Sequence, residues 1–189
     1  QRMCLYLQQS LEEGCIGLSS GLYYAPCIFA DHKELLALLS VVASFDRLFS
    51  VHVRCEGSDI LDSIQEVLDL ARLSGVKLQI SHLKVIGKKN QRLVPSMLAL
   101  IEQARVEGVD VQFDQYPYEY GSTSLFSLLP PPYLKLGRSE LKSALGSESE
   151  RRIIKAMMEE GKGWDSIASL CGWDDIKVLV LHSNPQYEG

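Results

Sequence analysis

The sequence repeats one pattern about every 30 residues: a short apolar run, then polar residues, then an amphipathic segment. Four of these runs end near Ser19, His52, His82 and Asp114, which are 33, 30 and 32 residues apart. One β-strand, one helix and their turns take roughly 30 residues. Consecutive units of this length form parallel strands joined by right-handed crossovers. The spacing therefore predicts an α/β fold built on a parallel sheet.

Apolar periodicity and helix-boundary signals place the individual elements. Asp31 and Glu34 form a capping-box pattern, and Ser58 is the expected cap of a later helix. The run Leu129-Pro130-Pro131-Pro132 is expected to break regular structure, because proline lacks an amide hydrogen. The expected strands are residues 15–19, 48–53, 76–80, 109–113 and 176–181, and the expected helices are residues 3–13, 31–44, 58–75, 93–106, 138–145 and 148–160.

Two parallel architectures fit this pattern, a (β/α)8 barrel and an open doubly wound sheet. An open sheet gathers its site where the strand order reverses, whereas a barrel uses the loop after every strand. Here polar or titratable residues follow all four runs. We therefore expect part of a (β/α)8 TIM barrel, with roughly four to five β/α units.

Composition argues against several classes of partner. The net charge is −5, which gives no electrostatic reason to expect a nucleic acid or an anionic membrane. No apolar run reaches the ~18 residues of a membrane span, and the first residues lack the pattern of a signal peptide. The five cysteines are odd in number and include no Cys-x-x-Cys pair. That usage favours a cytoplasmic location over a disulfide framework.

Two strings, Val51-His52-Val53-Arg54 and Ser81-His82-Leu83-Lys84, place a histidine at the end of an apolar run. Equivalent ends of parallel strands meet at one edge of the sheet, so both imidazoles are expected to point into one cavity and to bind a metal. The alternative is two structural histidines. Two imidazoles are in any case too few, because a catalytic zinc normally has three protein ligands.

A cation follows each histidine after one residue. Arg54 and Lys84 share strand parity with the histidines and are expected to face the same interior. A buried cation needs an anionic partner. That partner is either a carboxylate of the chain, Glu56 or Asp114, or the carboxylate of a substrate.

The segment after the fourth run offers further polar groups. Tyr116 and Tyr118 flank Pro117 and could present phenolic donors at the rim of a pocket. Gly121-Ser122-Thr123 could form a loop whose amides bind an anion. The sequence contains no P-loop, no Gly-x-Gly-x-x-Gly and no Ser-His-Asp order with a nucleophile elbow.

Taken together, these strings resemble the N-acyl-D-amino-acid deacylases (D-aminoacylases) of the amidohydrolase superfamily. Order and spacing agree from about residue 11 to the C-terminus. The matching strings are Gly17-Leu18-Ser19-Ser20-Gly21-Leu22, His52-Val53-Arg54-Cys55-Glu56, Ile80-Ser81-His82-Leu83-Lys84, Asp114-Gln115-Tyr116-Pro117-Tyr118, Gly121-Ser122-Thr123 and Leu129-Pro130.

The resemblance implies a zinc-dependent hydrolase that cleaves the amide bond of a small N-acyl amino acid. His52 and His82 would be the Zn2+ ligands that end strands five and six of the barrel. Lys84 and a tyrosine of the Tyr-Pro-Tyr string would hold the substrate carboxylate. The full set of substrate-binding residues expected on this basis is Ser19, Arg54, Lys84, Tyr116, Tyr118 and Ser122.

The same resemblance implies that the rest of the site lies outside residues 1–189. A His-x-His pair and a cysteine ligand would precede Gln1, and the general-base aspartate would follow Gly189. We therefore expect residues 1–189 to be the central part of one barrel domain, inactive in isolation and able to self-associate. Cys27, Cys55 and Gln91 depart from the family's residues, which leaves acyl and side-chain specificity open.

Two alternatives remain at this point. A cyclic amidohydrolase of the dihydroorotase or hydantoinase type usually holds two metals with a carboxylated lysine, and no lysine ends a run ahead of His52. A non-catalytic relative that binds small carboxylates would keep the cations and the fold but would hydrolyse nothing.

Overall fold

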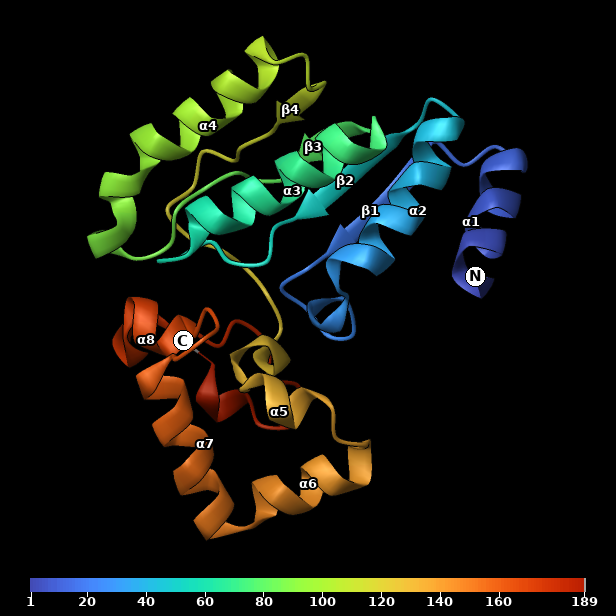
Figure 1. Cartoon of the computed structure of the whole chain (residues 1–189). Coiled ribbons are helices and arrows are strands. Elements are labelled where there is room, and N and C mark those ends of the chain that lie inside the picture. The colour runs from blue at the N-terminus through green and yellow to red at the C-terminus, as the bar shows by residue number, and fades with distance from the viewer. Residues whose placement is uncertain (189) are drawn as a thin grey trace. The chain divides into compact units, whose positions relative to one another are not determined.

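The computed structural model describes residues 1–188, which fall into two compact units. Unit 1 comprises Gln1–Val85 and Lys89–Ser122; unit 2 comprises Ile86–Lys88 and the residues from Thr123 onward. Each unit is described by itself, with the elements labelled as in Figure 1. The elements up to Ser122 are α1 (Arg2–Glu12), β1 (Gly17–Gly21), η1 (Cys27–Phe29), α2 (His32–Ser44), β2 (Leu48–His52), α3 (Ile60–Ser74), β3 (Lys77–Ile80), η2 (Lys88–Leu93), α4 (Val94–Val106) and β4 (Val111–Phe113).

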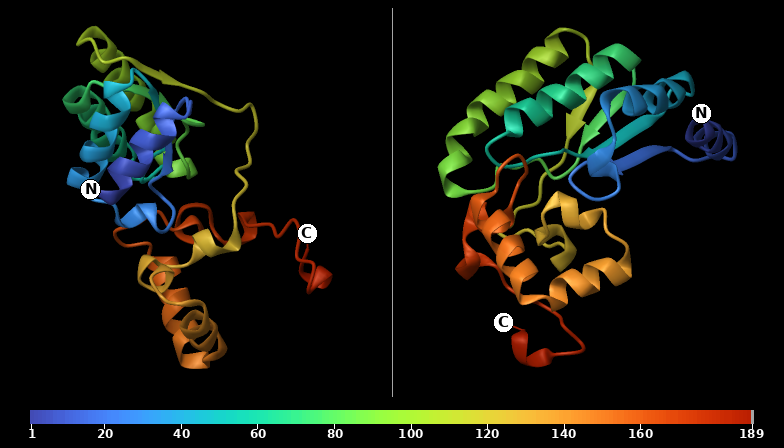
Figure 2. Two further views of the ribbon diagram at one scale, coloured as in Figure 1. Left: turned by 90° about the vertical axis from the view of Figure 1, so that its right-hand side faces the viewer. Right: turned by 60° about the horizontal axis from the view of Figure 1, so that its bottom comes forward.

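The sheet of unit 1 has four parallel strands in the order β1-β2-β3-β4. The strand order therefore follows the chain and never reverses. Helices α2, α3 and α4 pack against one another in sequence, so they cover the same face of the sheet (Figures 1 and 2). A doubly wound sheet carries helices on both faces. One helical face with sequential strands is the arrangement found in a segment of a (β/α)8 barrel.

The two faces of the sheet differ in chemistry. Phe49 and Val51 of β2 are buried under the helices, and so are Leu78 and Ile80 of β3. The alternate positions form a polar row across the other face. Because neighbouring strands are in register, this row places Ser19 beside Ser50, Ser50 beside Gln79, and Gln79 beside Gln112.

Helix boundaries follow local chemistry. Asp31 caps α2 as predicted, because its carboxylate accepts the Glu34 amide hydrogen at 2.8 Å. Gly75 ends α3 in the left-handed conformation that glycine adopts without strain. The prediction that Ser58 caps α3 is wrong. The residue before the helix is Asp59, and no side chain makes a capping hydrogen bond there.

The described residues of unit 2 contain helices joined by irregular segments and no strand. Ile154, Met158 and Ala168 form its small core, and Ser147 caps α7. Its elements are η3 (Leu125–Leu128), α5 (Pro131–Leu134), α6 (Arg138–Gly146), α7 (Glu148–Glu160), α8 (Ile167–Cys171), η4 (Trp173–Asp175) and η5 (Pro185–Tyr187).

Two predictions fail in unit 2. Residues 176–181 form no strand, and Leu179 and Val180 are 72% and 62% exposed. A strand needs a partner for its amides and carbonyls, and the described part of unit 2 contains none. The proline run also does not exclude regular structure. Pro131 begins α5 at the first helical position, where a missing amide hydrogen costs nothing.

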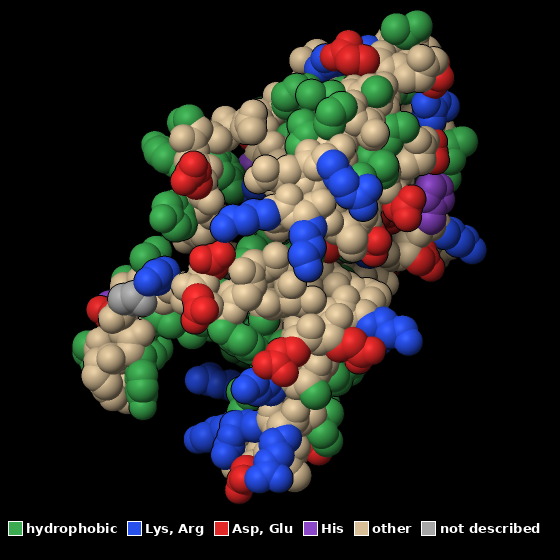
Figure 3. Space-filling view, turned by 90° about the vertical axis from the view of Figure 1, so that its left-hand side faces the viewer, with side chains coloured by type: hydrophobic (Ala, Val, Ile, Leu, Met, Phe, Trp, Pro, Cys, Tyr) green, Lys and Arg blue, Asp and Glu red, His purple; other side chains and the backbone are tan. Residues whose placement is uncertain are grey.

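None of the described helices is both long and apolar enough to cross a membrane. Figure 3 shows one face of the molecule, on which acidic and basic side chains are interspersed and hydrophobic side chains reach the surface in several places. The exposed large hydrophobic residues of unit 1 include Leu5, Ile16 and Val106.

Candidate metal centre

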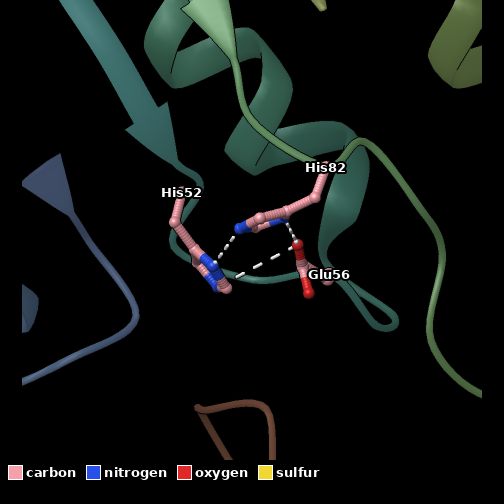
Figure 4. Close-up of side chains that lie close together, drawn as sticks. All are labelled: His52, Glu56 and His82. Carbon is pink, nitrogen blue, oxygen red and sulfur yellow. Dashed lines mark hydrogen bonds and ion pairs between the residues drawn. The ribbon is translucent and has the colours of Figure 1, made fainter. Parts of the chain in front are cut away.

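The ends of β2 and β3 bring two histidines together. His52 is the last residue of β2, and His82 lies two residues beyond β3. The strands are paired up to Val51 and Ile80, so the two imidazoles leave the sheet side by side. His52 Nδ1 lies 3.0 Å from His82 Nε2, and Figure 4 shows the two side chains next to each other.

His82 lies in an unusual backbone turn. The φ angle of His82 is 41°, in the left-handed region that residues other than glycine rarely adopt. Asp114, which follows β4, holds this turn because its Oδ1 accepts the His82 amide hydrogen at 2.6 Å. The other oxygen, Oδ2, accepts a hydrogen bond from Gln79 at 2.7 Å. Asp114 therefore fixes the backbone of His82 to the neighbouring strands.

Glu56 is a buried carboxylate that lies beside both imidazoles. The residue is 4% exposed and its side chain points at both histidines (Figure 4). Its Oε1 lies 3.3 Å from His82 Nδ1 and 3.9 Å from His52 Nε2. Lys84 completes the group with its Nζ 2.7 Å from the same oxygen. A buried carboxylate is stable only with such partners.

Burial keeps His52 neutral. The pKa of His52 is lowered to about 3, first by burial and then by the neighbouring His82 and Lys84. The rings of Tyr23 and Tyr24 lie with their centroids 5.6 and 5.0 Å from that of His52 and contribute to its cover. A neutral imidazole offers the lone pair that a metal requires.

The donor set fits a divalent metal. His52, Glu56 and His82 each place a ligand atom within 4.8 Å of the others. Two atoms that each lie 2.0–2.1 Å from a tetrahedral zinc are roughly 3.3 Å apart. The 3.0 Å between His52 Nδ1 and His82 Nε2 is close to that value, whereas Glu56 Oε1 lies 3.3 Å from Nδ1, the other nitrogen of the His82 ring. Two histidines and a carboxylate are also a donor set that zinc accepts.

Lys84 reaches the same cluster and a tyrosine lies beside it. Its Nζ is 2.9 Å from His82 Nδ1 and 5.4 Å from the centre of the Tyr116 ring. The pKa of Tyr116 is raised by burial, by the charge of Glu56 and by Tyr24. Tyr116 therefore stays a neutral phenol that can donate a hydrogen bond.

Arg54 lies elsewhere. Its guanidinium forms an ion pair with Glu66 of α3 at 2.9 Å and donates to the carbonyls of Ile28 and Ala30 at 2.8 and 3.1 Å. The Glu66 carboxylate also raises the pKa of Arg54. Because β2 ends at His52, strand parity does not extend to residue 54. The expected partners Glu56 and Asp114 are replaced by Glu66, and the role of Arg54 in substrate binding stays a prediction.

The other predicted residues are spread more widely. Ser19 lines an open cavity of about 430 Å³ next to both histidines. Tyr118 stacks on Tyr116 with ring centres 6.4 Å apart, yet it is 73% exposed. Ser122 is exposed at the end of unit 1. The cavity is lined by Ser19, Ser20, Gly21, Tyr24, Cys27, Ser50, His52, Ser81 and His82.

Three residues have larger roles in the structure than the sequence predicts. The sequence predicts Glu56 only as a possible partner for a cation, whereas Glu56 contacts both histidines and Lys84. The same prediction for Asp114 misses that its carboxylate holds the His82 turn. Glu56 lies four residues after His52, and this spacing is the signal that could have found it. Tyr24 gave no signal, because nothing in its local pattern indicates contact with a strand 28 residues away.

Comparison with known proteins identifies relatives of part of this chain. No family model matches the chain. The chain is 39% identical over 119 residues to an N-acyl-D-glutamate deacylase of Alcaligenes xylosoxydans xylosoxydans, a match that covers 63% of this chain and 24% of that protein. The aligned part amounts to about a quarter of the length of each of the curated relatives that the chain matches.

Solved structures of the same kinds of enzyme also match part of this chain. The N-acyl-D-glutamate deacylase of Bordetella bronchiseptica, crystallised with zinc and a phosphonate mimic of the tetrahedral intermediate, is 38% identical with a TM-score of 0.60, over 61% of this chain and 24% of that one. A D-aminoacylase crystal structure matches 81% of this chain and 36% of its own at 29% identity and a TM-score of 0.59. The four parallel strands and their helices thus match part of an amidohydrolase TIM barrel. Over about 60% of its length, this chain is homologous to the D-aminoacylase-like amidohydrolases.

Proposed function

We propose that residues 1–189 carry part of the active site of a zinc-dependent hydrolase that cleaves the amide bond of N-acyl-D-amino acids. One observation carries the proposal: two imidazoles 3.0 Å apart beside a buried carboxylate, in a chain homologous to such deacylases. The relatives act on N-acyl-D-amino acids with different side chains, so the proposal names the substrate class and not one member.

In this proposal His52 and His82 are the metal ligands of the chain. Their imidazoles already face each other, and burial keeps His52 in the neutral form that binds metal. Zinc, when bound, would lower the pKa of a water molecule and polarise the scissile carbonyl. Asp114 supports the second ligand by holding the His82 turn. The proposal assigns no general base to the described residues.

Lys84 and Tyr116 are proposed to recognise the substrate carboxylate. An ammonium group and a neutral phenol next to the metal ligands can both donate to a carboxylate, and such charge-assisted hydrogen bonds are strong. Ser19, at the floor of the cavity, is a further donor. Arg54 holds structure in this proposal, because its guanidinium is already engaged by Glu66 and two carbonyls.

The test removes one ligand in the protein that carries residues 1–189. His82→Ala should abolish both stoichiometric zinc and the hydrolysis of N-acetyl-D-glutamate, N-acetyl-D-aspartate and apolar N-acetyl-D-amino acids. His32→Ala is the matched control, since His32 is exposed on α2. If the His82 variant keeps zinc and activity, the assignment is wrong. Ring opening of a hydantoin, with no N-acyl hydrolysis, would instead favour a cyclic amidohydrolase.

We also propose that residues 1–189, expressed alone, hydrolyse none of these substrates and self-associate. Within the described residues β1 and β4 are edge strands with one neighbour each, and open strand edges pair readily with another chain. Exposed apolar side chains such as Leu5 and Ile16 add to this tendency. Sedimentation equilibrium should show species larger than a monomer; a monomer at all concentrations would contradict the proposal.

A further inference from the structure

All three hydrogens of the Lys84 ammonium group are used in hydrogen bonds to Glu56 and His82. It donates to Glu56 Oε1 at 2.7 Å, to His82 Nδ1 at 2.9 Å and to the His82 carbonyl at 3.1 Å. An ammonium group has three hydrogens and accepts no hydrogen bond. With three acceptors in place, Lys84 has no donor left for a ligand.

The bond from Lys84 fixes the tautomer of His82. Because the ammonium can only donate, His82 Nδ1 must present its lone pair to it. The ring hydrogen of the neutral imidazole then sits on Nε2, where it can be donated to His52 Nδ1 across 3.0 Å. In this arrangement both ring nitrogens of His82 are occupied.

A metal on His82 is incompatible with that bond, whichever nitrogen it takes. A metal on Nδ1 uses the lone pair that Lys84 needs. A metal on Nε2 moves the ring hydrogen to Nδ1, which then cannot accept from an ammonium group. In the second case the Nδ1 hydrogen faces Glu56 Oε1 at 3.3 Å, so the carboxylate takes over as the partner of His82.

We infer that metal binding at His82 releases the Lys84 ammonium group from the imidazole and so makes it available to the carboxylate of a ligand. This inference rests on the proposed metal site and adds an order to it: metal first, carboxylate second. Glu56 keeps Lys84 at the cluster through its 2.7 Å ion pair, and the Tyr116 ring lies beside the freed group. Metal and carboxylate therefore bind with positive coupling, which must be reciprocal.

The first measurement needs no variant. In NMR spectra of 15N-lysine-labelled chain without metal, Lys84 should give an ammonium signal that is protected from exchange with water, because all three hydrogens are bonded. Saturating Zn2+ should remove this protection. Protection that persists when zinc is bound overturns the inference.

The second measurement tests the coupling with acetate as the carboxylate probe. Zinc affinity is measured by calorimetry for the wild-type chain and for Lys84→Met, and acetate affinity is measured for both with and without zinc. Lys84→Met should bind zinc about 10-fold more tightly, since one hydrogen bond to a charged group no longer has to be broken. Removing the positive charge of Lys84 would also tighten zinc binding. Acetate binding therefore decides whether the lost hydrogen bond or the lost charge is the cause.

Zinc should strengthen acetate binding to the wild-type chain, and Lys84→Met should lose that gain. If the variant keeps the whole gain, acetate binds the metal directly and the inference is wrong. If zinc binds neither protein, the metal site fails, and the proposed function fails with it. If zinc binds both equally and the Lys84 signal does not change, only the coupling is disproved. A thermal unfolding transition for Lys84→Met confirms that the variant is folded.

Discussion

The loops after β2 and β3 begin with the same pattern, a histidine followed after one residue by a cation, yet they use the cation differently. Arg54 turns toward the helical layer, where it pairs with Glu66 and holds two carbonyls. Lys84 turns toward the histidines and Glu56. The first cation pairs with a helix and the second lies among the candidate metal ligands. The difference shows that a motif places its histidine through the strand, while the path of the loop decides where the next residue goes.

The largest expected effect concerns His52, at the end of β2, and the dependence of stability on pH. The pKa of His52 is lowered from 6.5 to about 3 in the metal-free fold. Between these pH values the unfolded chain binds a proton that the folded chain does not. The titration of His52 therefore leaves the free energy of unfolding unchanged above pH 6.5. This free energy falls by up to about 1.4 kcal/mol per pH unit as the pH drops toward 3.

Urea unfolding of the metal-free chain across this pH window measures the slope. His52→Asn should flatten it, while His32→Asn, at an exposed position on α2, should not. An unchanged slope in His52→Asn would show that other groups cause the acid sensitivity.

Replacing Arg54 should lower the free energy of unfolding more than replacing Lys84. Arg54→Met removes an ion pair and the donors of two carbonyls, so it should lower the free energy of unfolding by about 3 kcal/mol. Lys84→Met should cost less, because Glu56 retains His82 as a partner 3.3 Å away. Urea denaturation of both variants makes the comparison. Equal losses would mean that Lys84 is as structural as Arg54.

The second histidine needs support that the first does not. His52 is part of β2, whereas His82 lies in a left-handed turn held by Asp114. Asp114→Ala should weaken zinc binding by about 10-fold, the low end for loss of a residue that orients a ligand. The exposed Asp110, next to the same strand, gives the control variant Asp110→Ala. Zinc affinity by calorimetry decides, and an unchanged affinity would show that the turn holds without Asp114.

The smallest effect concerns how the helices after β1 and β2 begin. Asp31→Ala should cost about 1 kcal/mol, because the carboxylate caps α2. Asp59→Ala should change the free energy of unfolding by only a few tenths of a kcal/mol, since Asp59 makes no capping bond at α3. Thermal unfolding of both variants tests this, and an equal loss for Asp59→Ala would show that Asp59 stabilises the start of α3 without a capping hydrogen bond.

The sequence predicted what depends on local periodicity. The four strands of unit 1, the crossover helices and the capping box at Asp31 are present as expected, and the barrel architecture is confirmed by the comparison with solved structures. The spacing of His52 and His82 predicted their proximity, because register in a parallel sheet fixes which strand ends meet.

The failures lie where partners distant in the sequence decide the outcome. The apolar run at 176–181 has strand-like composition, yet no strand in the described part of unit 2 is there to pair with it. Arg54 and Lys84 could not be distinguished, because Glu66 and Glu56 compete for cations only once the loops are folded. The functional roles of the site residues remain predictions, and the variants above test them.

The polar row across the sheet has a consequence for how such a site can change over evolution. Positions such as Phe49 and Val51 carry the packing of the helices, whereas Ser19, Ser50, Gln79 and Gln112 lie on the opposite face. One strand therefore carries two sets of residues with different surroundings, one packed under the helices and one on the opposite face. Ser19 and Ser50 of the polar row also line the cavity, so substitutions there would change its surface while the packed layer under the helices stays intact.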